Sequence, residues 1–325
     1  MRKIIAILAV LMLILVGCKT EGPEFTSEDV YKGIEGISLS FTKNSPPTEV
    51  FENSVFPVGI EVWNKGAYDI EEGYLFVNLD TDYMEAANWI EGVSIFPADA
   101  AKAEFELKGK SDIARQGDRD VAALNVNTKF IDVLSEKHTS TVSATACYRY
   151  QTLASPNVCI DTDPFGIKEG QKSCTASDIT LTGGQGAPIA VEKVEVKMLP
   201  SQTGDKIVPQ FRIYVKNMGN GQVVDAEKVA DSCSSQGLSR TDINAVSVTA
   251  ALSSGIQLDC IPKRETGGPE GFLRLKGGED YVLCHYQDGI PLEYGTFKTT
   301  LNIVLDYGYV HSISKDVTIK KVVIV

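Results

Sequence analysis

Apolar and polar residues alternate along most of the chain after about its first 35 residues. Successive side chains of a β-strand point to opposite faces, so this pattern is typical of antiparallel strands with one buried face. Few segments show a helical period, and residues 225–230 are expected to form no more than single helical turns. The pattern predicts an all-β protein. The clearest runs are Ile37-Leu39-Phe41, Val58-Ile60-Val62, Phe211-Ile213-Val215 and Phe297-Thr299-Leu301-Ile303-Leu305.

Three short motifs occur in both halves of the chain, in the same order. "FPVGIEVWNKG" (56–66) parallels "PQFRIYVKNMG" (209–219), "FELKGK" (105–110) parallels "LRLKGG" (273–278), and "CYRYQT" (147–152) parallels "DYGYVH" (306–311). This order indicates two copies of one unit of roughly 110 to 140 residues, and short strands separated by turns in a unit of that size predict a β-sandwich.

Two of these motifs have structural interpretations. In Val-x-Asn-x-Gly, we expect the Asn and Gly to adopt the left-handed backbone that turns the chain into its next strand. The Tyr-x-Tyr motif is similar to the tyrosine corner of immunoglobulin-like sandwiches, in which a Tyr hydroxyl bonds to nearby backbone. Tyr148 or Tyr150, and Tyr307 or Tyr309, are therefore expected to be structural.

The Val-x-Asn-x-Gly strand and turn also resemble those of CARDB-type and related immunoglobulin-like modules of archaeal and bacterial surface proteins. The resemblance covers both halves of the chain. It implies an immunoglobulin-like fold and an adhesive, scaffolding or spacer role, and it assigns no catalytic residue.

The N-terminus, MRKIIAILAVLMLILVGCKT, has the pattern of an export signal. Arg2 and Lys3 precede an apolar run, residues 4–16, that is shorter than the roughly 20 residues a membrane span requires. Leu15-Val16-Gly17-Cys18 resembles the lipobox of prokaryotic lipoproteins, which implies cleavage before Cys18 and a lipid anchor on Cys18. The alternative is an ordinary secretory signal or a short uncleaved anchor.

These features predict an order of segments along the chain. A lipoprotein signal peptide (1–17) is followed by a polar tether (18–35), a first immunoglobulin-like β-sandwich (36–165), a linker or first strand (166–188) and a second sandwich (189–325).

The remaining six cysteines suggest disulfides, because an even number in an exported chain favours pairing. Six cysteines allow 15 pairings. Proximity favours Cys147 with Cys159 and Cys260 with Cys284, which leaves Cys174 with Cys233. Metal ligation is the alternative, but it requires C-x-x-C or nearby His spacing that the chain lacks. We therefore predict no metal site and no cofactor.

Composition narrows the possible partners. The chain has 325 residues, a hydrophobic fraction of 43% and a net charge of −12. The hydrophobic fraction suffices for real cores, and the negative charge disfavours nucleic acid because it repels phosphates.

No sequence motif indicates catalysis. "TGGQGAP" (182–188) lacks the Lys-Ser/Thr of a phosphate-binding loop and is interpreted as a turn. "DTDPFG" (161–166) and "DTD" (80–82) resemble parts of calcium loops, but position 12 from Asp161 is Lys172 rather than Glu, so the EF-hand pattern fails. A weaker calcium site between the sandwiches remains an alternative. His138, His285 and His311 lie in no metal motif.

The sequence therefore predicts a non-enzymatic, lipid-anchored cell-surface protein. Its role is binding, adhesion or scaffolding, and its partners are the membrane, through the lipid, and a surface protein or glycan. One alternative is a filament subunit that adds residues 316–325 as a strand to a neighbour, although closure of its own sheet is favoured. The other is a carbohydrate-binding accessory protein using Trp63 and Trp89, which are expected instead in the core or at its rim.

Overall fold

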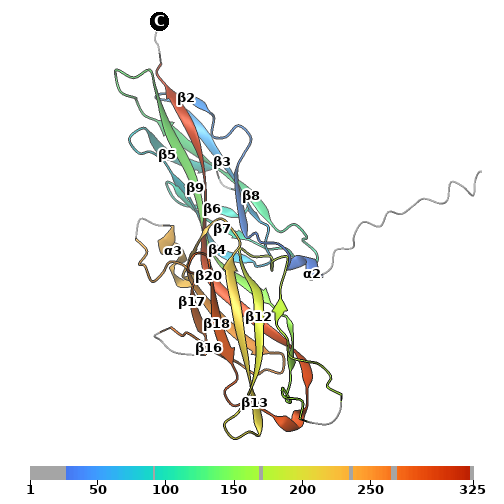
Figure 1. Ribbon diagram of the computed structural model, residues 1–325. Helices are drawn as coiled ribbons and strands as arrows, with labels where there is room; N and C mark the ends of the chain where they lie inside the picture. Colours follow the sequence, from blue (N-terminus) through green and yellow to red (C-terminus); the bar gives the residue numbers. More distant parts are fainter. Residues whose placement is uncertain (1–26, 91, 168–170, 234–236, 265–268, 323–325) are drawn as a thin grey trace, which may run out of the picture.

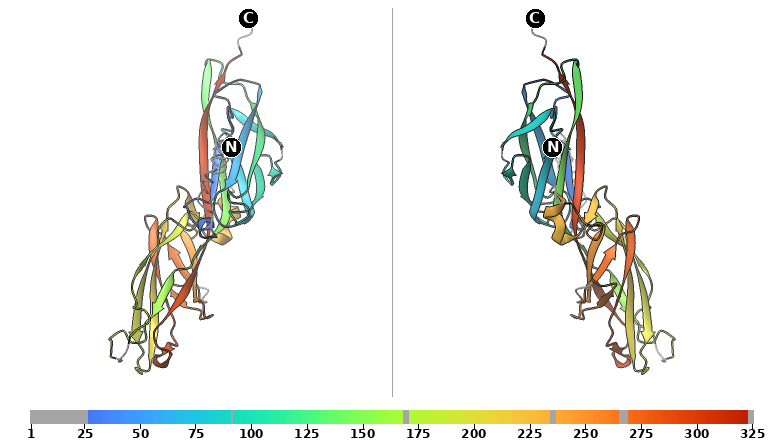
Figure 2. Two further views of the ribbon diagram at one scale, coloured as in Figure 1. Left: turned by 90° about the vertical axis from the view of Figure 1, so that its right-hand side faces the viewer. Right: turned by 90° about the vertical axis from the view of Figure 1, so that its left-hand side faces the viewer.

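The protein is an elongated all-β molecule in which two β-sandwiches lie end to end (Figures 1 and 2). The computed structural model describes residues 27–90, 92–167, 171–233, 237–264 and 269–322. The predicted all-β sandwich class is confirmed, and each of the four clearest alternating runs lies in a strand.

The first sandwich packs a four-stranded sheet against one half of a long sheet that runs through the molecule. The four-stranded sheet has the order β1 (Ile37–Phe41), β3 (Val55–Asn64), β8 (Arg119–Thr128), β5 (Met84–Ile90). The long sheet has the order β17 (Gly271–Arg274), β15 (Ala245–Leu252), β20 (Phe297–Lys320), β9 (Lys137–Ala154), β4 (Ile70–Asn78), β7 (Lys102–Leu107), β6 (Ile95–Asp99).

The second sandwich packs a six-stranded sheet against the other half of the long sheet. Its order is β11 (Ile179–Thr180), β12 (Ile189–Pro200), β13 (Lys206–Asn217), β18 (Glu279–His285), β16 (Asp259–Ile261), with β19 (Ile290–Pro291) beside β13. The short strands β2 (Glu49–Phe51), β10 (Asn157–Ile160) and β14 (Gln222–Val224) pair with β20. The helical turns are α2 (Ser27–Val30), η1 (Ala226–Lys228), α3 (Val229–Ser232) and η2 (Leu292–Tyr294).

The two sandwiches share their longest strands. β9 and β20 are antiparallel and pair without interruption from Ile303–Ala154 to Lys320–Lys137. The first part of β20 pairs with β15 in the second sandwich, whereas its last residues lie between β9 and β2 in the first sandwich. The end of the chain therefore completes the sandwich that its beginning forms. We call the crossing region, around the Arg149–Gly308 pair, the waist.

The repeated motifs occupy equivalent places in the two sandwiches. β3 corresponds to β13, β7 to β17, and β9 to β20, so β7-β4-β9 in one half matches β17-β15-β20 in the other. The two halves are thus related by a pseudo-twofold axis through the waist. Residues 316–320 pair within their own chain, as favoured, but in the first sandwich and not the second.

The four tyrosines of the Tyr-x-Tyr motifs meet at the waist and bond to backbone in equivalent ways. Tyr148 accepts from the Ile37 amide at 3.0 Å, and Tyr307 accepts from the Ile189 amide at 3.3 Å. Tyr150 and Tyr309 accept from backbone amides at the turns after β3 and β13. The expected structural role is confirmed. Burial raises the pKa of Tyr148 and Tyr307 well above the usual value, so both hydroxyls stay protonated.

The Asn-x-Gly turns form for a reason other than the predicted one. Asn64 accepts from the Gly66 amide and Asn217 from the Gly219 amide, each at 3.1 Å. Neither glycine has a positive φ. A Cβ on Gly66 would collide with the Tyr150 hydroxyl, and one on Gly219 with the Tyr309 hydroxyl. Glycine is therefore required by close approach to a tyrosine, and the expectation of a left-handed turn was wrong.

The described part of the predicted tether belongs to the folded protein. Val30 of α2 is buried, and Gly33 exchanges backbone hydrogen bonds with Gly183 and Gly186 at 2.7 and 2.8 Å. Residues 27–35 are thus fixed at the waist, and residues 18–26 lie outside the described residues. The segment 182–188 forms the predicted turn, in which Gly183, Gly184 and Gly186 have positive φ.

Three disulfides link the six cysteines. Cys260 pairs with Cys284, as predicted. The other two predicted pairs were wrong, because the structure joins Cys147 to Cys233 and Cys159 to Cys174. Cys147 lies on β9 within the first sandwich, and Cys233 follows α3, so this bond ties the two halves at the waist. Three disulfides indicate that the protein folds in an oxidising compartment.

His311 predicts a pH dependence of stability. Its two ring nitrogens are buried and have no hydrogen-bond partner among the described residues, and burial lowers its pKa. The unfolded chain therefore binds a proton more readily than the folded chain, so stability is highest above the ordinary His pKa and falls as the pH drops through the lowered one. Urea unfolding at pH 7, 6 and 5 is expected to show this loss, and His311→Gln to reduce its slope. An unchanged slope would contradict it.

Candidate functional site

A charged pocket lies at the waist, on the side that carries α3 and opposite α2 (Figures 1 and 2). Its residues come from both long strands, from β15, from η1 and from the segment before β17. The polar lining side chains are those of Arg149, Gln151, Asp225, Glu227, Ser247, Thr249, Arg264, Glu270 and Asp306.

Two arginine–aspartate pairs organise the pocket. Arg149 binds Asp306 with two parallel bonds, Nε to Oδ1 at 3.0 Å and Nη2 to Oδ2 at 2.5 Å, and this bonding raises the pKa of Arg149. Arg264 Nη2 lies 2.7 Å from Asp225 Oδ2. The forked Arg149–Asp306 contact holds both groups in fixed orientations, and Arg264 Nη2 also bonds Ser247 Oγ at 3.3 Å.

Carboxylates outnumber cations in the pocket. Glu227 and Glu270 add two acidic groups for which no ion pair occurs among the described residues. The lining thus holds four carboxylates and two guanidinium groups. Its excess of negative charge and its many hydrogen-bonding groups suit a ligand with a cationic, hydrogen-bonding head.

Gly308 and a disulfide hold η1 and α3 over the long sheet. A Cβ on Gly308 would meet side-chain atoms of Val224 and Val229 and the Asp225 carbonyl, so glycine lets η1 and α3 lie close to β20. The Cys147–Cys233 bond fixes the end of α3 to β9. Sequence reasoning missed this site, although a glycine inside an alternating strand often marks close backbone approach.

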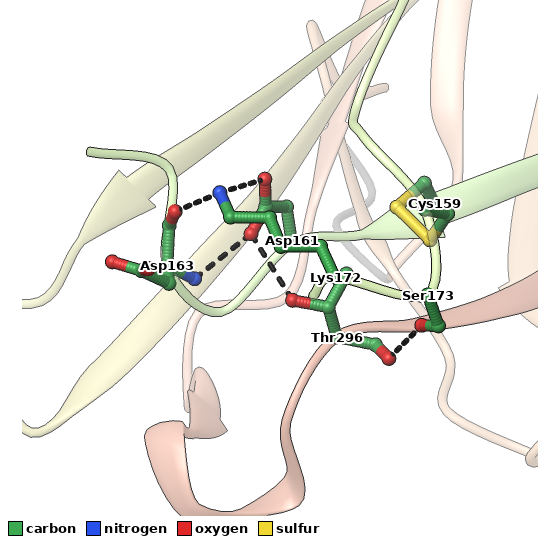
Figure 3. Close-up of a disulfide and its surroundings, with 7 residues drawn as sticks. Cys159, Asp161, Asp163, Lys172, Ser173 and Thr296 are labelled. Atoms are coloured by element: carbon green, nitrogen blue, oxygen red, sulfur yellow. Dashed lines mark hydrogen bonds and ion pairs between the residues drawn. A yellow bond between two sulfur atoms is a disulfide. The ribbon is translucent and has the colours of Figure 1, made fainter. Parts of the chain in front are cut away.

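The calcium-like segment "DTDPFG" binds the chain's own lysine (Figure 3). Lys172 Nζ lies 2.9 Å from Asp161 Oδ2 and also bonds the Asp163 carbonyl. The other Asp161 oxygen accepts from the Asp163 amide and from Thr296. The ammonium group at loop position 12 therefore occupies the place that a cation would take, beside the Cys159–Cys174 disulfide.

Replacement of Lys172 by Met is expected to lower the free energy of unfolding by up to about 3 kcal/mol. The change leaves the Asp161 carboxylate, which is only 3% exposed, without its cationic partner, and removing one partner of a buried ion pair is costly. Urea unfolding measures the loss. In the wild type, calcium and EDTA are expected to leave the melting temperature unchanged, and a calcium-induced increase would contradict the role given to Lys172.

The remaining sequence candidates lie in structural settings. Asp80 accepts from Ser140 at 3.1 Å and lies 3.7 Å from His138, within a turn. Trp63 is flanked by Lys65 and Arg119, whose cations lie 4.9 and 5.7 Å from its ring centre. Trp89 packs against the core. The indole N–H of Trp63 donates to the Gln116 carbonyl and that of Trp89 to the Asp99 carbonyl.

Cys18 and the export signal lie outside the described residues. Within those residues, no group of three His, Cys, Asp or Glu side chains is placed to hold a metal ion. No helix among them is long and apolar enough to cross a membrane.

No family model and no curated protein matches this chain. Among solved structures, the sixth cohesin of Acetivibrio cellulolyticus scaffoldin B is 17% identical, over 35% of this chain and 86% of its own, with a TM-score of 0.24. The Srr1 adhesion glycoprotein of Streptococcus agalactiae is 9% identical over 92% of this chain and 100% of its own (TM-score 0.20). The CupB6 tip adhesin of Pseudomonas aeruginosa is 9% identical over 90% and 96% (TM-score 0.14). Scores this low carry no inference about function.

Proposed function

We propose that this chain is a non-enzymatic, lipid-anchored surface protein that binds a cationic group of a partner protein in the waist pocket. The observation that supports it most is the excess of carboxylates in that pocket. The partner is inferred to present a Lys or Arg side chain, because an ammonium or guanidinium group matches both the charge and the acceptors of the lining.

The position of α2 supports a pocket that faces away from the membrane. The described chain begins at α2, on the opposite side of the waist from the pocket (Figures 1 and 2). A lipid on Cys18 would hold the molecule by its waist and leave the pocket facing away from the attachment point.

Cys18→Ser is expected to release the protein from the membrane fraction, and continued membrane association would contradict lipid anchoring at this residue.

A titration with short peptides tests the pocket. The wild type is expected to bind hexa-arginine and not hexa-glutamate in isothermal titration calorimetry. Glu227→Gln with Glu270→Gln is expected to weaken the binding of hexa-arginine about tenfold, because two charge-assisted contacts are lost.

The matched control is Glu71→Gln with Glu72→Gln on β4, which changes the net charge equally and lies outside the pocket. Retained affinity in this control supports a specific site. Equal weakening in both double variants would show that the binding of hexa-arginine depends only on the overall charge of the protein, and would overturn the pocket assignment.

Strand addition to a neighbour is less well supported. Residues 316–320 already pair with β9 on one side. Residues 318–320 also pair with β2 on the other side, so residues 318–320 have no free edge.

A further inference from the structure

Exposed apolar side chains gather at the free end of the first sandwich. Val133 and Leu134, in the loop between β8 and β9, are 86% and 99% exposed. Phe51, Val55 and Phe130 are each more than half exposed, and Val322 nearly half. We call these six residues the apical patch.

A buried glutamate brings the segments of the patch together. Glu52 is 6% exposed, and its two carboxylate oxygens accept from the amides of Ile131 and Val322, each at 3.1 Å. Glu52 thus joins the end of β2, the loop before β9 and the end of β20. Because Ile131 is buried, the loop is anchored, and its neighbours Phe130, Val133 and Leu134 point outward from a fixed base.

Several polar backbone groups of this loop are bonded within the protein. Lys321 Nζ bonds the Val133 carbonyl at 2.5 Å, and the Lys321 amide donates to the Glu136 carbonyl. The Ser135 amide donates to the Asp132 carbonyl. A loop whose backbone groups are bonded within the protein loses fewer hydrogen bonds to water when it leaves water. A lipid environment requires such internal bonding, whereas a wet protein interface does not.

Charged side chains of both signs lie around the patch. Lys129, Lys137, Lys320 and Lys321 lie near Glu49, Glu52, Asp132 and Glu136, and Asp80 and Asp82 lie close to Asp132, beside Tyr83. Three of the four ammonium groups are bonded within the protein: that of Lys129 to the Thr81 carbonyl, that of Lys320 to Glu49, and that of Lys321 to the Asp132 and Val133 carbonyls. Contact with headgroups therefore relies on the apolar side chains and not on these lysines.

We infer that the apical patch contacts the lipid bilayer, with Val133 and Leu134 inserted at the level of the headgroups. This inference relies on the proposed lipid anchor only because the anchor would keep the apical patch near a membrane. The eight residues between Cys18 and Ser27 reach about 30 Å when extended. The part of β20 from the waist to its end, twelve residues, spans about 40 Å. A molecule held at its waist therefore has to lean for its apical end to meet the membrane.

Vesicle sedimentation tests this with residues 19–325, which lack Cys18 and therefore any lipid. Vesicles of phosphatidylcholine alone, and of phosphatidylcholine with phosphatidylglycerol at about 3:1, are expected to sediment the wild type. Val133→Ser with Leu134→Ser is expected to reduce partitioning at least about tenfold, because two large apolar groups are lost. The fluorescence of Leu134→Trp is expected to shift to shorter wavelength on vesicles.

Ile113→Ser is the matched control, because Ile113 is 98% exposed and lies outside the patch. Equal loss in this control, or failure of the wild type to bind either vesicle, would overturn the inference. So would a dimer in lipid-free solution that Val133→Ser with Leu134→Ser dissociates, because a second copy would then cover the patch. Vesicle binding together with an unlipidated Cys18 would refute the anchor and leave the inference standing.

Discussion

Replacement of Ile319 by Ala is expected to lower the free energy of unfolding of the first sandwich by about 2–5 kcal/mol, the cost of truncating a buried Ile. Ile319 is fully buried near the end of the chain, opposite His138 on β9 and Val50 on β2. The loss arises in a sandwich that is otherwise built from residues of the first half of the chain.

Tryptophan fluorescence during urea unfolding measures this effect directly. The protein has two tryptophans, Trp63 on β3 and Trp89 on β5, and both lie in the first sandwich. Ser312→Ala, at an exposed position of the same strand, serves as the control and is expected to change little. If Ile319→Ala leaves the fluorescence transition in place, β20 does not complete the first sandwich.

Removal of the Cys147–Cys233 disulfide by replacing both residues with Ala is expected to cost about 4–5 kcal/mol. The two cysteines are 86 residues apart, and a long loop gains much entropy in the unfolded chain when the bond is lost. Removal of Cys159–Cys174, which are 15 residues apart, is expected to cost only about 3 kcal/mol.

Chemical unfolding of the two double variants, side by side, checks this order. The Cys147 and Cys233 variant is also expected to weaken hexa-arginine binding, since α3 and η1 lose their covalent attachment to β9. A smaller loss for this variant than for the Cys159 and Cys174 variant would count against the waist as a stabilising junction.

The sequence was sufficient to predict the strands, but not to predict that β9 and β20 each take part in both sandwiches. Inward-facing residues of β20 fall on odd positions from Leu301 through Tyr307 to Ile319, so one period of two continues across both sandwiches. A strand of 24 residues is far longer than the usual 3–10, and this led to separate interpretations of residues 297–305 and 316–325. Pairing between distant segments leaves no local signal by which the crossing can be recognised.

Sequence proximity also misled the disulfide assignment. Cys147 and Cys159 flank an apparent hairpin turn, but β9 and β10 both lie along β20 instead of folding back on each other. Their side chains therefore have different neighbours. Cys260 and Cys284 lie on the adjacent strands β16 and β18, directly opposite in register, so proximity succeeded there.

The waist pocket could not be predicted from the sequence for a related reason. Arg149, Asp225 and Asp306 lie in three separate segments, and none belongs to a motif with a characteristic spacing. Lys172, in contrast, was visible at position 12 of the calcium-like segment. The sequence showed that it replaces the expected Glu, and the structure adds that its ammonium group binds the carboxylate the metal would have bound.

The most direct test of the account is peptide mapping by mass spectrometry of the non-reduced protein from the membrane fraction. Arg or Lys lies between every two successive cysteines from Cys147 to Cys284, so trypsin separates all six. We expect Cys147 linked to Cys233, Cys159 to Cys174 and Cys260 to Cys284, with a lipid on an N-terminal Cys18. A Cys147–Cys159 link, or six free thiols, would contradict an exported protein whose two halves exchange strands at the waist.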